Sequence, residues 1–139
     1  MFRYEKEQTI NKVGDVELGG QPGELPTVLI GTLFYKGHKI VRDPQRGIFD
    51  KMSTEALVNR QEEFSDKTGS PHMFDIVGES AEALIKELDF IASVSNAPLL
   101  IDGLNASIRI PAAKYAMESG MGERVIYNSL DATTKEEEL

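Results

Sequence analysis

The hydrophobic positions of this chain form short apolar runs that alternate with longer, more polar segments. Four runs rich in aliphatic and β-branched residues predict strands. They are Thr27–Leu33 (TVLIGTL), Met73–Val77 (MFDIV), Pro98–Ile101 (PLLI) and Arg124–Tyr127 (RVIY). Runs that are apolar almost throughout are typical of strands buried on both faces, as in a parallel sheet. The pattern therefore favours an α/β fold over an all-β or all-α one.

Two helices are predicted in the longer segments. The first begins at Ser53, taken as its N-cap, and runs to about Thr68, where Gly69 ends it. Ser80 caps the second, which carries an apolar stripe made of Leu84, Leu88 and Ile91. Strand and helix in alternation imply right-handed βαβ units with the helices packed on the sheet.

A third helix is predicted within Asn105–Ser119, with Pro111 in its first turn and Gly120 as its stop. Near the end of the chain, Thr133 to Glu137 resembles a capping box and predicts the start of a fourth helix. A frayed acidic tail is the alternative, and in either case Glu136 to Glu138 is expected to be solvated.

The segment before the first sheet strand has a different pattern. Thr9–Leu18 reads as two short strand-like runs around Gly14 and Asp15, which predicts a β-hairpin. We therefore divide the chain into residues 1–26, a hairpin with a Gly/Pro-rich lead-in, and residues 27–139, four βα units. Eight such units make a (β/α)8 TIM barrel of about 250 residues, so the fold expected is about the first half of one.

Composition narrows the function. The net charge of −8 and the scattered basic residues argue against a nucleic-acid partner, because phosphate binding needs clustered Lys and Arg. The N-terminus lacks the apolar core of a signal peptide and no run of 18 apolar residues occurs, so a cytoplasmic protein is expected. The absence of cysteine excludes disulfides, cysteine-ligated zinc and thiolate nucleophiles.

Candidate site residues follow from the parallel sheet, because ligands of such folds bind beyond the carboxyl ends of the strands. The positions to inspect are Phe34, Tyr35, His38, Asp75, Gly78, Glu79, Asp102 and Asn128. Asp102 is the most informative, because a carboxylate after PLLI is costly to desolvate unless a donor meets it. The alternative for Asp102 is a turn-forming Asp before Gly, and Asn128 is either a ligand-binding amide or a cap.

The two histidines are weaker candidates. Neither His38 nor His72 has a second histidine nearby, and Asp75 falls on the opposite face of the strand from His72. We therefore expect both to be exposed or packed in loops, and predict no metal site. No catalytic residue is assigned.

Several segments together resemble the family formed by the H subunit of tetrahydromethanopterin S-methyltransferase and its bacterial relatives. The most specific is the stretch from Gly19-Gly20-Gln21-Pro22-Gly23-Glu24 through PTVLIGTLFY to GHKIV, followed by GIFDK. DIVGES, PLLIDG and VIYNS then follow in order, so the resemblance extends over essentially all of the 139 residues.

The resemblance implies a methyltransferase of the pterin-binding barrel group, acting in methanogenesis or one-carbon metabolism. Its reaction moves a methyl group between N5 of a reduced pterin, tetrahydromethanopterin or tetrahydrofolate, and the cobalt of a corrinoid. It implies that the pterin is a substrate rather than a tightly bound cofactor, and that a partner protein carries the cobalamin. It further implies that Asp102 and Asn128 hold the pterin ring, and that other subunits of a membrane complex are partners.

Family members are about twice as long, so the chain alone is expected to hold only part of the active site. Two alternatives stay open: a dihydropteroate-synthase-like enzyme, and a non-catalytic half-barrel that acts as an interaction module. Because a half-barrel leaves two apolar edge strands, we also expect a homo-oligomer.

Overall fold

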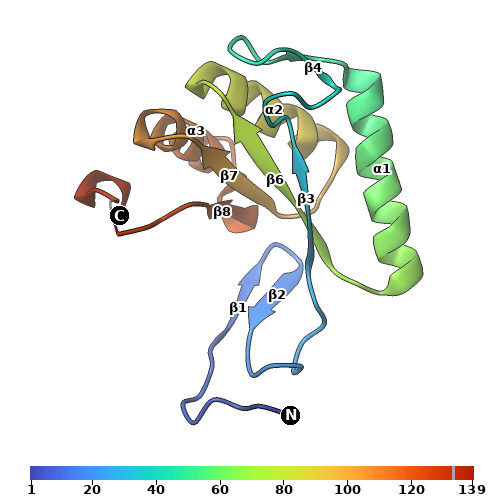
Figure 1. Ribbon diagram of the computed structural model, residues 1–139, viewed down its shortest axis with the longest axis vertical. Helices are drawn as coiled ribbons and strands as arrows, with labels where there is room; N and C mark the ends of the chain where they lie inside the picture. The colour runs from blue at the N-terminus through green and yellow to red at the C-terminus, as the bar shows by residue number, and fades with distance from the viewer. Residues whose placement is uncertain (133) are drawn as a thin grey trace.

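A four-stranded parallel sheet forms the centre of the protein (Figure 1). The computed structural model describes residues 1–132 and 134–139. The sheet strands lie in the order β3-β6-β7-β8, and every neighbouring pair is parallel. Their bounds are Leu29–Leu33 (β3), His72–Gly78 (β6), Leu99–Gly103 (β7) and Val125–Tyr127 (β8). The predicted parallel α/β fold is confirmed, and spatial order follows chain order.

Three helices cover one face of this sheet: α1 (Lys51–Thr68), α2 (Ala81–Val94) and α3 (Ala106–Glu118). Alternate strand residues such as Ile76 and Ile101 pack against Leu88 of α2 in the main hydrophobic core. These side chains are almost fully buried, and full burial of each is worth about 1.5–3 kcal/mol. The helix-facing side therefore supplies most of the apolar burial.

The helix ends agree with the sequence in part. Ser80 caps α2 by accepting a hydrogen bond from the Ala83 N–H, as predicted. Gly69 ends α1 in the left-handed conformation, also as predicted. The predicted N-cap of α1 was wrong: Asp50 is the cap, and its carboxylate accepts from the Ser53 N–H. Pro111 lies inside α3 rather than in its first turn.

The predicted N-terminal hairpin is confirmed, with β1 at Ile10–Val13 and β2 at Val16–Gly19. In Figure 1 it lies below the sheet, near the end where the parallel strands begin. Val16 packs with Met73 and Leu100 in a second, smaller hydrophobic cluster. The hairpin thus covers apolar side chains at the strand starts, on the face turned away from the helices.

A second hairpin was not predicted. It consists of β4 (Val41–Asp43) and β5 (Ile48–Phe49), strands too short to give a periodic pattern. Its Gly47 has a φ of 61°, and a Cβ there would lie 2.7 Å from the Ala83 Cα. The hairpin therefore packs closely on the start of α2, and only glycine fits this contact.

The C-terminal segment differs from the expectation. Two short 3₁₀ helices, Gly122–Arg124 and Glu136–Glu138, flank β8, and the second stands where an α-helix was predicted to start. The part of the proposed capping box at Thr133 lies outside the described residues. Glu138 was expected to be solvated, but its carboxylate instead accepts hydrogen bonds from Arg109 and Tyr127.

Candidate functional site

The face of the sheet opposite the helices carries polar side chains near the ends of the strands. Asp75 of β6 is paired in register with Thr32 of β3, so both point away from the helices. Asp102 of β7 lies opposite Val77, which shares this parity with Asp75. Asn128 directly follows β8. We call Thr32, Asp75, Asp102, Asn128 and Ser129 the strand-end cluster.

One amide joins the two carboxylates of this cluster. Asn128 Nδ2 lies 3.5 Å from Asp75 Oδ1 and 3.4 Å from Asp102 Oδ2, and donates to both. Thr32 Oγ1 donates to Asp75 Oδ2 at 3.3 Å. These bonds are long, so the oxygens keep capacity to accept shorter hydrogen bonds from a ligand.

Backbone geometry fixes the other side of the cluster. The Ser129 N–H donates to Asn128 Oδ1 at 2.9 Å, and the Ser129 hydroxyl donates to Asp102 Oδ1 at 3.2 Å. Ser129 has a φ of 69°, a left-handed conformation that non-glycine residues seldom adopt. Strained residues of this kind are concentrated at functional sites.

The electrostatics of the cluster centre on Asp75. Burial raises the pKa of Asp75 above its ordinary value, and the nearby charge of Asp102 raises it further. Hydrogen bonds from Thr32 and Asn128 lower it by less. A carboxyl group with a raised pKa beside a second carboxylate is the kind of group found where ligands or protons are handled.

Asp102 forms the contact of the turn-forming alternative and also faces the strand-end cluster. It lies within β7 rather than after it, as the fourth residue of the strand Leu99–Gly103. Its Oδ1 accepts from the Gly103 N–H at 2.7 Å, as in the turn-forming alternative, while its Oδ2 faces Asn128. A cavity of about 680 Å³ adjoins it, lined also by Asn105, Arg109 and Ser129. Asp102 therefore stands at the edge of accessible space.

The structure does not bring the other strand-end candidates into the cluster. Phe34 is buried in the main core, and its N–H donates to His38 Nδ1. Tyr35 and His38 stack on each other with ring centroids 4.6 Å apart, so His38 is packed in its loop as expected. Gly78 meets Leu84 of α2, and the Glu79 carbonyl oxygen accepts from Gln45.

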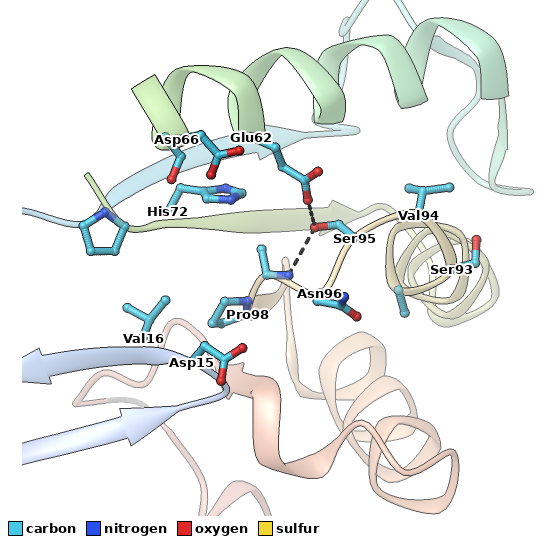
Figure 2. A pocket seen from close by; sticks show the side chains of 14 residues that line it. Asp15, Val16, Glu62, Asp66, His72, Ser93, Val94, Ser95, Asn96 and Pro98 are labelled. Carbon is cyan, nitrogen blue, oxygen red and sulfur yellow. Dashed lines mark hydrogen bonds between the residues drawn. The ribbon is translucent and has the colours of Figure 1, made fainter. Parts of the chain in front are cut away.

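His72 lies at the other end of the sheet, where a second cavity of about 560 Å³ opens (Figure 2). Its ring contacts Gln61 of α1, on the opposite face of β6 from Asp75. Glu62 accepts a hydrogen bond from Ser95 in the same cavity, as the dashed line in Figure 2 shows. This cavity lies where the parallel strands begin, away from the end at which such folds bind ligands.

Thr32 and Ser129 were not singled out from the sequence, and Asp75 was named without a role. The signal available for Asp75 and Thr32 was a polar residue at an alternate position inside an apolar run. Only the register between β3 and β6 shows that the two are neighbours. The position of Ser129 depends on its own left-handed backbone conformation, which the residue type serine does not predict.

Comparisons with known proteins give one consistent result. A family profile described as the tetrahydromethanopterin S-methyltransferase MtrH subunit matches residues 6–139. The H subunit of tetrahydromethanopterin S-methyltransferase from Methanopyrus kandleri is 49% identical over all of this chain and 44% of its own length. That of Methanothermobacter marburgensis is 47% identical, and the H subunit of a putative mtx methyltransferase from Methanosarcina mazei is 48% identical. Each of these two is covered over 45% of its own length and all of this chain.

The chain thus spans less than half the length of the curated relatives it matches. Among residues 1–132 and 134–139, no helix is both long and apolar enough to cross a membrane. A profile match over nearly the whole chain, with identity near one half, shows that the chain belongs to the family of the tetrahydromethanopterin S-methyltransferase MtrH subunit.

Proposed function

We propose that this chain supplies the pterin-binding part of a methyltransferase that moves a methyl group between N5 of tetrahydromethanopterin and the cobalt of a corrinoid. The observation that carries the proposal is the strand-end cluster, in which Asp75 and Asp102 face one amide on the open side of the sheet. The cobalt belongs to a separate corrinoid-carrying protein, and no residue of this chain is assigned to it.

The chemistry of the cluster suits the edge of a pterin ring. The 2-amino group and the adjacent ring N–H are donors that point the same way, and a carboxylate accepts both. Asp102 is the acceptor in this proposal, with Asn128 beside it. A hydrogen bond to a charged, partly desolvated group contributes about 1.5–3 kcal/mol, so two such bonds are enough to orient a ligand.

The proposal includes a fold. The four parallel strands form the first half of a closed (β/α)8 barrel, and further contacts to the substrate come from a second half. Two observations support this: β3 and β8 have no further strand beside them among the described residues, and the relatives are more than twice as long. The strand-end cluster then faces the barrel interior at its carboxyl end, where barrel enzymes hold their substrates.

A ligand-side experiment tests the proposal. Isothermal titration calorimetry compares a tetrahydropterin with its 2-deamino analogue, which lacks one of the two donors. The protein is this chain, within the longer polypeptide if the chain is part of one. We expect the analogue to bind at least tenfold more weakly, equal to about 1.4 kcal/mol. Equal binding of the two, or no binding of either, would contradict the proposal.

A further inference from the structure

Asn128 takes part in three hydrogen bonds that together leave its amide one orientation. Nδ2 donates to Asp75 and Asp102, and Oδ1 accepts from the Ser129 N–H. If the amide turned over, Oδ1 would face two carboxylates and Nδ2 would face an N–H group. Both contacts would be repulsive, so the carboxylates decide which edge of the amide meets a ligand.

Asp75 contributes to this orientation from a place where its presence needs an explanation. It lies mid-strand in β6 and is half-buried. It caps no helix and forms no ion pair in the described part of the chain. Its contacts are Thr32, Asn128 and the charge of Asp102. A mid-strand carboxylate facing another carboxylate is unfavourable for folding alone, since burial and like charge both oppose ionisation.

We propose that Asp75 is a positioning residue of the pterin site, which acts by holding the Asn128 amide in its ligand-binding orientation. The inference rests on the proposed function for the identity of the ligand, but the orientation itself is a property of the chain. Thr32 holds the far oxygen of Asp75 from the edge strand β3. The chain of contacts therefore runs Thr32 to Asp75 to Asn128, across three different strands or strand ends.

The substitution that tests this is Asp75→Asn, which keeps size and shape. Both present neighbours of the Asp75 carboxylate are donors, and an amide at this position accepts with only one of its two ends. The hydrogen bond from Asn128 is then either lost or no longer made to a charged acceptor, so the orientation of the Asn128 amide is held less firmly. We expect tetrahydropterin affinity to fall about tenfold, with a small change in melting temperature. Asp66→Asn, on an exposed site of α1 at the other end of the sheet, is the control.

Two readouts separate a positioning role from a merely structural one. The side-chain amide resonances of Asn128, followed by NMR without ligand, should shift in Asp75→Asn and stay unchanged in Asp66→Asn. In a double-mutant cycle, Asp75→Asn should cost little further affinity once Asn128 is Ala, because the group it positions is gone. Unchanged Asn128 resonances, or full additivity with Asn128→Ala, would overturn the inference.

The proposed pterin function and the positioning role of Asp75 can each be contradicted without the other. If Asp102→Ala abolishes tetrahydropterin binding while Asp75→Asn changes neither affinity nor resonances, the role of Asp75 is wrong and the pterin site stands. If the wild-type protein does not bind tetrahydropterin, the proposed function fails, and the Asn128 resonances still decide whether Asp75 orients the amide.

Discussion

Arg109 of α3 and Glu138 near the C-terminus form an ion pair with both side chains nearly buried. Nη2 of Arg109 lies 2.6 Å from Oε2 of Glu138, and the two side chains are 9% and 5% exposed. Tyr127 donates to the same carboxylate oxygen, and Arg109 also donates to the Gly103 carbonyl oxygen. The pair thus ties the residues after β8 to α3 and β7.

Removal of one partner should destabilise the protein more than an ordinary surface substitution does. Glu138→Gln leaves the Arg109 charge buried without its counter-ion, which is unfavourable in a poorly solvated place. We expect a lower urea midpoint for Glu138→Gln and no measurable change for Glu137→Gln, the exposed neighbour. Equal midpoints for the two variants would show that the tail is not held by this pair.

A pH dependence of stability should come from Glu87 of α2. The residue is 2% exposed, and its Oε2 has no hydrogen-bond partner among the described residues. Burial, assisted by Glu79, raises the pKa of Glu87 to about 8 from an ordinary 4.5. The folded state therefore holds a proton that the unfolded state releases, so stability should fall as pH rises from about 4.5 to about 8.

Each pH unit in this window lowers the free energy of unfolding by about 1.4 kcal/mol. Glu87→Gln removes the titrating group, so this variant should be more stable than the wild type by about 3 kcal/mol at pH 7 and nearly equal at pH 4.5. Urea unfolding at several pH values measures the slope. Glu82→Gln, an exposed position on the same helix, should keep the wild-type slope. A slope retained in Glu87→Gln would contradict the assignment.

Asp102→Ala should weaken ligand binding more than it weakens the fold. The side chain touches the Gly103 N–H, Asn128 and Ser129, and none of these contacts is a core contact. We expect reduced-pterin affinity to fall at least tenfold, with the melting temperature nearly unchanged. Calorimetric titration and thermal unfolding measure the two quantities. Unaltered affinity would remove Asp102 from the site.

Asn128 and Asp102 should behave as a unit in binding. Their side chains lie within hydrogen-bond distance and would contact one flat ring. The double Ala variant should therefore lose less binding free energy than the sum of the two single losses, as measured by calorimetry. Strict additivity would mean that the two residues serve different ligands.

The sequence alone predicted the strands of the sheet, but it did not predict the side-chain contacts of the candidate site. The apolar runs located all four parallel strands, because strands of a parallel sheet carry almost continuous hydrophobic residues. The N-cap of α1 was harder to predict, because Asp and Ser are both favourable N-cap residues. Only the backbone geometry shows that Asp50, and not Ser53, is the cap. The bridge between Asp75 and Asn128 joins residues 53 positions apart, and it depends on strand register, which a single sequence does not fix.

The isolated chain is expected to associate through the two edges of its sheet. β3 and β8 are the outer strands, and no further strand pairs with either among the described residues. Leu29 and Ile30 of β3 are 50% and 52% exposed, and β3 (LIGTL) has no charge to discourage pairing. β8 (VIY) has none either.

Two copies related by a two-fold axis would set β8 of each beside β3 of the other and close an eight-stranded parallel sheet. Both strand-end clusters would then face the same interior. Sedimentation equilibrium at micromolar concentration should give a mass of at least about twice 15.4 kDa.

Ile30→Lys places a charge on the open edge and should shift the chain toward monomer, whereas Met52→Lys, 84% exposed on α1, should not. A 15.4 kDa monomer that unfolds cooperatively would show that the edges are stable unpaired, and would remove the main argument for a closed barrel.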